Sequence, residues 1–268
     1  MAKAVIYFFS GTGNTDFVAR TFASVLNELG YNTDVKAIDF LENIEIESYD
    51  LVGFGYPVYS FGPALPMLNF INNFPVVSNK KAFTFCTMGG MSGGSEHFEA
   101  KKLKKKGFDV IGAYKIRMPH NYPTGYVPKK KSSEKMAGRA KLKITGICKS
   151  VVDGRKKHLK FISLMQILLY LYLYKMFNKF KRFGRSLYAF GAYADNKCTE
   201  CGLCVRMCPV KNIFIKNNVV QFGADCTYCL RCLHNCPVSA IQYKKKTLKR
   251  DRYRGPLGDY RPPLNDKL

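Results

Sequence analysis

The stretch Ala4–Thr15, AVIYFFSGTGNT, joins a short apolar run to a loop of glycines and hydroxyl side chains. The run is rich in residues that favour β-strands, and a helical pattern with its apolar residues on one face follows directly. In such an arrangement backbone N–H groups and the positive end of the helix dipole point at one anion, and Ser and Thr hydroxyls add donors. The sequence therefore predicts a strand, a phosphate-binding loop and a helix, in that order.

Other phosphate motifs fit this loop poorly. A Walker A loop requires G-x-x-x-x-G-K-[ST], and the loop has no lysine. A dinucleotide fingerprint requires a third glycine at position 16, where the chain has Asp16. The loop instead resembles the phosphate loop of flavodoxins, S/T-x-T-G-N-T. The resemblance implies an FMN phosphate held by Ser10, Thr12, Asn14 and Thr15, with Gly11 and Gly13 in the same loop.

The rest of the first half shows alternating strand and helix patterns. Further strands are expected near Thr33–Ile38, Leu51–Tyr56, Ala82–Thr87 and Val110–Met118. This alternation predicts an α/β fold with a doubly wound, parallel, five-stranded sheet in the flavodoxin-like order 2-1-3-4-5. In such sheets a ligand lies beyond the carboxyl ends of the strands, here between strands one and three.

Two loops are expected at that edge, Gly55–Gly62 and Thr87–Gly94. By the resemblance to flavodoxins they enclose the isoalloxazine ring of FMN, with Tyr59 or Tyr56 stacked on it. A surface turn that carries an amphipathic tyrosine is the alternative. Glycines in the second loop would let backbone amides approach the ring edge. The candidate residues of these loops are Tyr56, Pro57, Val58, Tyr59, Thr87, Met88, Gly89 and Gly90.

A cysteine motif, C-x2-C-x2-C-x3-C-P, occurs twice in the last third of the chain. In bacterial two-cluster ferredoxins three thiolates of such a run hold one [4Fe–4S] cluster and the fourth reaches the other cluster. Zinc ribbons and disulfides are the alternatives, but a zinc site has no use for a third and fourth cysteine at this spacing. The first cluster would take Cys198, Cys201, Cys204 and Cys236, and the second Cys226, Cys229, Cys232 and Cys208.

Several basic residues stand near these motifs: Arg206, Lys211, Lys216 and Arg231. Reduction adds negative charge to a cluster, so nearby positive charges favour it. We therefore expect the two clusters to have higher potentials than those of acidic ferredoxins.

The chain as a whole resembles a fusion of a flavodoxin with a two-cluster bacterial ferredoxin, a combination found in anaerobes. We expect an FMN-binding domain at 1–150, a basic, partly apolar helical linker at 151–190, a small α+β ferredoxin domain at 191–245 and an extended basic tail at 246–268. The resemblance implies electron transfer between two [4Fe–4S] clusters and FMN, and on to a redox partner. The alternative is an FMN-dependent reductase of a small substrate, so whether the chain is an enzyme stays open.

The net charge of +24 lies mostly in the middle of the chain. Lys and Arg outnumber Asp and Glu by 24 to 3 in residues 101–190 and by 14 to 6 after them, but are outnumbered 5 to 10 in residues 1–100. Such a basic region favours an acidic redox partner, such as a ferredoxin or flavodoxin. It contains no nucleic-acid-binding motif, and we expect no nucleic acid. Thiolate clusters and an N-terminus without an export signal predict a cytoplasmic location.

The segment Leu159–Phe177 fits neither resemblance. Its apolar run, Phe161–Tyr174, is shorter than the roughly 20 residues that a bilayer span requires, and basic residues flank it. Three interpretations stay open: a buried helix that bridges the two domains, a helix that lies in a membrane interface, and a homodimer face.

Overall fold

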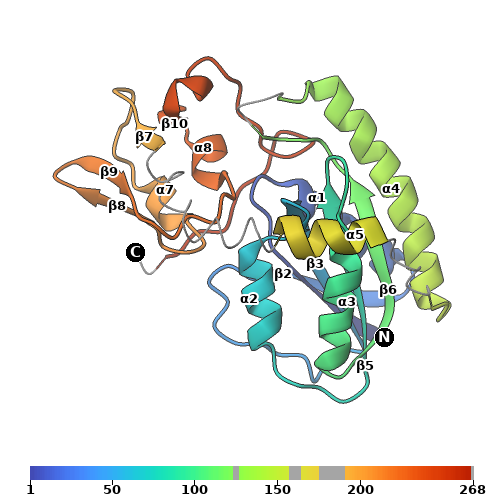
Figure 1. The fold of residues 1–268 in the computed structure, drawn as a ribbon. Helices are drawn as coiled ribbons and strands as arrows, with labels where there is room; N and C mark the ends of the chain where they lie inside the picture. The colour runs from blue at the N-terminus through green and yellow to red at the C-terminus, as the bar shows by residue number, and fades with distance from the viewer. Residues whose placement is uncertain (123–126, 157–163, 175–190, 267–268) are drawn as a thin grey trace.

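The computed structural model describes residues 1–122, 127–156, 164–174 and 191–266. An α/β unit forms the first part, and a smaller unit with the cysteine motifs forms the second (Figure 1). The chain after the small unit returns to the α/β unit, so that the two units contact each other through several segments.

A parallel sheet forms the centre of the α/β unit. Its long strands lie in the order β2-β1-β3-β5-β6, and the short β4 pairs with β3 in antiparallel fashion. Taken in chain order, the five long strands have the predicted arrangement 2-1-3-4-5. Their bounds are β1 Ala2–Phe8, β2 Tyr31–Ala37, β3 Leu51–Tyr59, β4 Gly62–Pro63, β5 Lys80–Met88 and β6 Phe108–Arg117.

Helices cover both faces of the sheet, as in a doubly wound fold (Figure 1). Helices α1 (Asn14–Glu28) and α4 (Lys130–Val152) bury apolar residues in the core on one face. Helices α2 (Leu65–Asn73) and α3 (Ser95–Lys105) do the same on the other face. Because both faces are covered, the central strands read as continuous apolar runs rather than as alternating patterns.

Two phenylalanine rings of β5, Phe83 and Phe85, pack against Gly53 and Gly55 of β3. A Cβ atom at Gly55 would overlap the ring of Phe85, and one at Gly53 would come within 2.8 Å of the ring of Phe83. Phe85 in turn stacks on Phe22 of α1, with ring centroids 4.7 Å apart. Glycine in β3 therefore makes room for the aromatic layer under α1.

The small unit consists of two short sheets and two short helices, an α+β arrangement as predicted. Strand β7 (Ala192–Ala194) pairs with β10 (Ile241–Tyr243), and β8 (Ile213–Lys216) pairs with β9 (Val219–Phe222). The helices are α7 (Leu203–Arg206) and α8 (Arg231–Asn235), and the 3-10 helix η2 (Lys244–Thr247) follows β10. Cysteine thiols make up much of the core of this unit, so the unit is expected to need its metal for stability.

The tail, residues 248–266, has no regular secondary structure, but it is packed against the protein. Tyr253, Tyr260 and Asn265 are each 5% exposed. The extended tail predicted from composition is therefore part of the folded structure.

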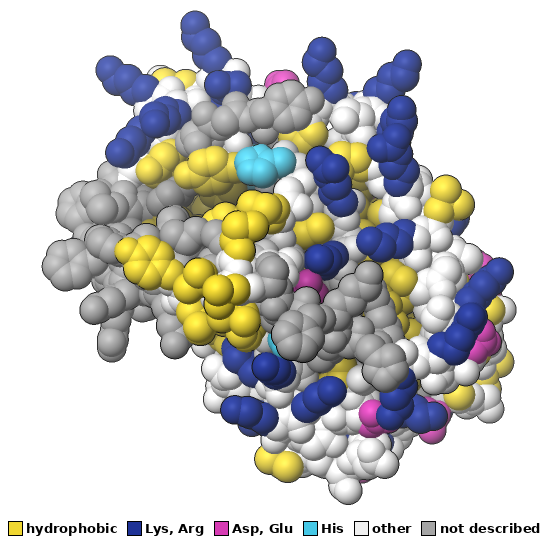
Figure 2. All heavy atoms as spheres, turned by 45° about the vertical axis from the view of Figure 1, so that its right-hand side comes forward, with side chains coloured by type: hydrophobic (Ala, Val, Ile, Leu, Met, Phe, Trp, Pro, Cys, Tyr) yellow, Lys and Arg dark blue, Asp and Glu magenta, His cyan; other side chains and the backbone are white. Residues whose placement is uncertain are grey.

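The apolar segment is described over residues 164–174, and 157–163 and 175–190 lie outside the described residues. Helix α5 (Leu164–Leu168) and the π-helix η1 (Leu169–Tyr174) lie across α3, where the buried ring of Tyr170 stacks on Phe98 at 3.7 Å. Several apolar side chains here are exposed: Leu164, Met165, Leu168, Leu171 and Tyr172. Figure 2 shows hydrophobic side chains grouped on this face. This part of the segment is thus not the buried bridge that was one of three interpretations.

Among the described helices, none has the length and apolar character that a membrane-spanning helix needs.

Replacing Gly55 by Ala tests the aromatic layer. The added methyl would displace Phe85, and overpacking of this kind costs about 1–3 kcal/mol of unfolding free energy. Urea unfolding of the α/β unit, followed by circular dichroism, measures the loss. Gly90→Ala is the control, because a Cβ at Gly90 meets no atom within 4 Å. Equal stability of the two variants would contradict the packing described here.

Candidate functional site

The phosphate loop connects β1 to α1 and is closed by its own hydrogen bonds. Gly13 has a left-handed backbone, with φ of 98°, and precedes the first residue of α1. Its N–H donates to the Ser10 hydroxyl oxygen at 3.1 Å. A Cβ at Gly13 would come within 2.6 Å of the Tyr260 Cβ, and one at Gly11 would overlap the carbonyl oxygen of Cys229. Glycine is required at both positions because other parts of the chain approach so closely.

The donors of this loop fit a phosphate monoester. The backbone amides at the start of α1, a helix of 15 residues, and the hydroxyls of Ser10, Thr12 and Thr15 are concentrated in one turn. All three hydroxyl side chains are at most 3% exposed. A buried set of neutral donors at a helix N-terminus binds an anion through amides and dipole rather than through a counter-charge. The residues present therefore fit the phosphate of FMN.

The other predicted loops gather at the same edge of the sheet. The hydroxyls of Thr15 and Thr87 lie 2.8 Å apart, which joins the first turn of α1 to the end of β5. The Asn121 amide donates to the Thr12 hydroxyl, which brings in the segment after β6. Met88 and Gly89 are half-buried next to this contact, and Gly90 is exposed.

The two candidate stacking tyrosines occupy different surroundings. Tyr56 is fully buried in the core, where the Ser95 hydroxyl donates to its oxygen at 3.3 Å. The hydroxyl of Tyr59 lies at the phosphate loop, 2.5 Å from the position that a Cβ of Gly11 would take. Burial raises the pKa of Tyr59 well above its usual range, and the neighbouring Cys229 adds to the shift. Pro57 and Val58, between the two tyrosines, are half-buried. Because Tyr56 is in the core and Tyr59 lies at the phosphate loop, stacking on a flavin stays a prediction for Tyr59.

The eight motif cysteines line two cavities, four to each. We call the first group the inner set, Cys208, Cys226, Cys229 and Cys232, and the second the outer set, Cys198, Cys201, Cys204 and Cys236. This grouping is the one that the cross-over rule of two-cluster ferredoxins predicts. In the described part of the chain, no three His, Cys, Asp or Glu side chains converge to hold a single metal ion. The thiols line cavity walls instead.

Two buried donors support a cofactor in the inner cavity. The Thr227 hydroxyl and the Arg231 Nε have no hydrogen-bond partner among the described residues, and both residues line that cavity. Buried donors normally have an acceptor, and the sulfides of an iron–sulfur cluster accept such bonds. Burial raises the pKa of Cys229 to about 12, while Arg231 acts in the opposite direction. Iron provides the positive charge that turns such thiols into thiolate ligands.

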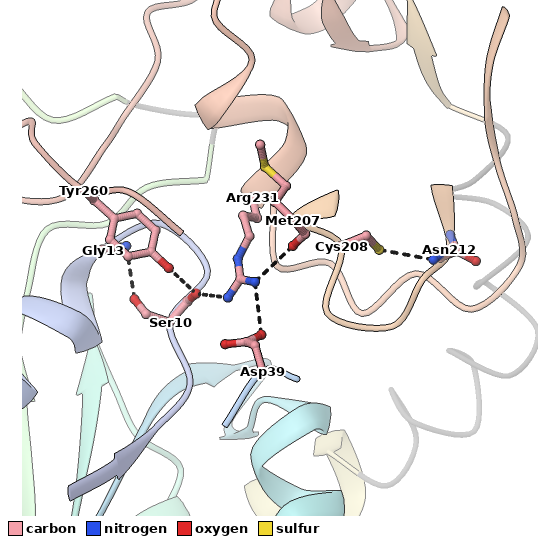
Figure 3. Close-up of polar contacts among 8 residues, drawn as sticks. All are labelled: Ser10, Gly13, Asp39, Met207, Cys208, Asn212, Arg231 and Tyr260. Carbon is pink, nitrogen blue, oxygen red and sulfur yellow. Dashed lines mark hydrogen bonds and ion pairs between the residues drawn. The ribbon is translucent and has the colours of Figure 1, made fainter. Parts of the chain in front are cut away.

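Arg231 joins the inner set to the α/β unit (Figure 3). Its guanidinium is 1% exposed and forms an ion pair of 3.0 Å with Asp39, which follows β2. It also donates to the carbonyl oxygens of Ser10, at 2.6 Å, and Met207, at 3.0 Å. Its carbon lies 5.3 Å from the centre of the Phe9 ring. Burial opposes the charge of Arg231, but Asp39, Tyr260 and Cys229 together outweigh this, and the pKa of the guanidinium is raised.

His234 makes a second connection between the units. The backbone N–H of Tyr253 donates to its Nδ1 at 2.9 Å, and its Nε2 lies 3.1 Å from the carbonyl oxygen of Asn121. Burial lowers the pKa of His234 to about 4, so the neutral ring carries its proton on Nε2 and donates to Asn121. Asn121 and Tyr253 then contact Thr12 and Asn14 of the phosphate loop.

Sequence reasoning did not find Asp39, Asn121, Tyr253 or Tyr260 as site residues. Each lies far along the chain from the loop that it contacts, and neither spacing nor residue type marks it. The signal that could have drawn attention to the tail is its composition, because tyrosines and glycines alternate with arginines in RYRGPLGDYR, residues 252–261.

Two family models match the chain. One, described as a flavodoxin domain, matches residues 4–138, and the other, described as a 4Fe-4S binding domain, matches residues 194–214. The second match contains Cys198, Cys201, Cys204 and Cys208.

Similar proteins cover about half of the chain. An uncharacterised protein of Methanocaldococcus jannaschii is 34% identical over 124 residues, which are 46% of this chain and 79% of that protein. A flavodoxin from the domain Archaea is 17% identical with a TM-score of 0.38, over 55% of this chain and 99% of its own. The two-electron reduced flavodoxin of Megasphaera elsdenii is 24% identical with a TM-score of 0.38, over 52% of this chain and 98% of its own.

Replacing Asp39 by Asn tests the ion pair at the junction. The variant leaves the Arg231 charge buried and without its partner, which costs about 3–5 kcal/mol. Urea unfolding of the full chain measures this loss. The control is Asp153→Asn, because the Asp153–Arg155 pair is exposed and its loss changes stability by less than about 1 kcal/mol. An Asp39→Asn variant as stable as the control would show that the junction does not depend on this pair.

Replacing Thr227 by Val tests the donor to the inner cavity. Loss of one hydrogen bond to a cluster, worth about 1 kcal/mol, would lower that cluster's potential by roughly 40 mV. Redox titration monitored by paramagnetic resonance measures the shift. Thr199 holds the corresponding place in the first motif but is exposed, so Thr199→Val is the control and should leave both potentials unchanged. Equal shifts in the two variants would contradict the assignment.

Proposed function

Because this chain belongs to the flavodoxin domain family and carries a 4Fe-4S binding domain, we propose that it passes electrons between two [4Fe–4S] clusters and FMN, and on to a redox partner. The two matches make it an electron-transfer iron–sulfur flavoprotein. The number of clusters, the residues that hold each cofactor and the nature of the partner are the content of the proposal.

The proposed FMN site is the edge of the sheet where β1, β3 and β5 end. The phosphate loop would hold the phosphate, and Tyr59 with the glycines after Met88 would enclose the ring. FMN takes up one or two electrons, whereas a [4Fe–4S] cluster takes up one. A chain that holds both can therefore connect single-electron and two-electron partners.

The observation that carries the proposal is the contact between the phosphate loop and the inner set. The Cys229 carbonyl lies directly against Gly11, and Arg231 binds the Ser10 carbonyl. Cys229 also belongs to the hydrophobic core of the α/β unit. The ligands proposed for one cluster and those proposed for FMN are thus neighbours in one packed structure.

The outer set has a different environment. Each set has two buried cysteines, but Cys201 of the outer set is exposed, whereas no cysteine of the inner set is. We therefore place the inner cluster between FMN and the outer cluster, and the exchange with a partner at the outer cluster. The basic surface, with Lys and Arg side chains spread over the face in Figure 2, suits an acidic redox protein.

In this proposal the FMN-binding domain comprises residues 1 to about 150, since α4 ends at Val152. The ferredoxin domain begins near residue 191, and the segment between is a linker that contacts α3 through Tyr170.

Cofactor analysis of the anaerobically purified chain tests the proposal. We expect one FMN with roughly eight iron and eight sulfide per chain, as two [4Fe–4S] clusters require. Stepwise reduction should show electrons distributed over all three centres. Replacing Cys226 and Cys232 by Ser, or Cys198 and Cys201 by Ser, should each leave roughly four iron. A chain that binds no FMN, or binds zinc at the motifs, would contradict the proposal.

A further inference from the structure

The carbonyl oxygen of Ser10 accepts two hydrogen bonds from outside the α/β unit. Arg231 donates to it at 2.6 Å and the Tyr260 hydroxyl at 2.8 Å (Figure 3). Both acceptor positions of this oxygen are thereby used. In a trans peptide the C=O and the next N–H point in opposite directions, so fixing the Ser10 carbonyl also fixes the N–H of Gly11. That N–H then points away from Tyr260 and Arg231.

The tail also fixes the start of α1. The Tyr253 hydroxyl donates to the Asn14 side-chain oxygen at 2.6 Å, while the Asn14 amide nitrogen donates to the Pro119 carbonyl at 2.9 Å. The side chain of Asn14 is thus held from two sides. Its backbone N–H, at the N-terminus of α1, is a donor for an anion. Gly13 packs against Gly255, whose Cα would lie 2.8 Å from a Cβ at Gly13.

The small unit holds the tail in this position. The guanidinium of Arg252 donates to the carbonyls of Ser239 and Ile241, each at 3.0 Å. The backbone N–H of Tyr253 donates to His234, and that of Asn265 donates to the Arg206 carbonyl at 2.9 Å. The two tyrosines are therefore presented to the phosphate loop by a segment that is fixed on both sides of them.

We propose that Tyr253 and Tyr260 are positioning residues of the FMN phosphate site, and that the tail orients the amides of the phosphate loop toward the phosphate. The inference rests on the proposed FMN binding and extends it to residues outside the flavodoxin domain. It makes the affinity for the phosphate of FMN depend on a segment attached to the iron–sulfur unit. Because binding energies are coupled reciprocally, bound FMN would in turn stabilise the attachment of the tail.

Comparison of FMN with riboflavin tests this proposal, because the two ligands differ by the phosphate. The cluster-loaded full chain is stripped of flavin, and each ligand is rebound under anaerobic conditions with flavin fluorescence as the readout. Tyr253→Phe and Tyr260→Phe each remove one hydroxyl and keep the ring. Each should weaken FMN binding about fivefold to tenfold, the effect of one buried hydrogen bond, and leave riboflavin binding unchanged. Tyr193→Phe, at an exposed tyrosine, is the matched control.

The outcomes separate the inference from the function on which it rests. An unchanged or increased FMN affinity in both variants would overturn the inference, and so would an equal loss for FMN and riboflavin, which indicates a general structural effect. In these cases the wild-type chain still binds FMN and the proposed function stands. A wild-type chain that binds neither flavin would overturn both.

Discussion

The buried guanidinium of Arg231 is the interaction on which the structure of the site depends. It comes from the loop of the inner set, and it binds Asp39 and the Ser10 carbonyl of the α/β unit as well as the Met207 carbonyl next to Cys208. A buried charge is costly unless it is paired and hydrogen-bonded, and here one planar group satisfies acceptors from three separate segments. The two units therefore have a defined relative position at this point.

The topology of the sheet places the phosphate loop at the same edge as the junction around Arg231. The phosphate loop follows β1, next to the point where the strand order reverses, and it is therefore at the edge where ligands of such sheets bind. Asp39 follows β2, the neighbour of β1, and so lies at the same edge. The inner set attaches to that edge, whereas the outer set lies in a separate cavity. This order supports the proposed electron route from the outer set through the inner set to the flavin.

The sequence predicted the elements with local signals and missed the contacts between distant ones. The individual strands and the phosphate loop follow from periodicity and residue type, which are short-range signals. The strand order and the grouping of the cysteines follow from the resemblance to flavodoxins and two-cluster ferredoxins. Arg231 was visible as a basic residue near a motif, but its pairing with Asp39 joins residues 192 positions apart. Tyr260 and Ser10 are 250 positions apart, and the tail that brings them together has the composition of an exposed segment. Tyr56 and Tyr59 looked equivalent in sequence, and only packing places one in the core.

The central claim is that the inner cluster, not the outer one, exchanges electrons directly with the flavin. Transient absorption after a flash-generated one-electron reductant tests it in the two double-cysteine variants. With the inner set intact and Cys198 and Cys201 replaced, we predict that electrons equilibrate between cluster and flavin at a rate independent of protein concentration. With Cys226 and Cys232 replaced, this first-order phase should be lost. The account would be contradicted by a first-order phase that persists without the inner cluster. It would also be contradicted by a rate of equilibration that rises with protein concentration when the inner cluster is present.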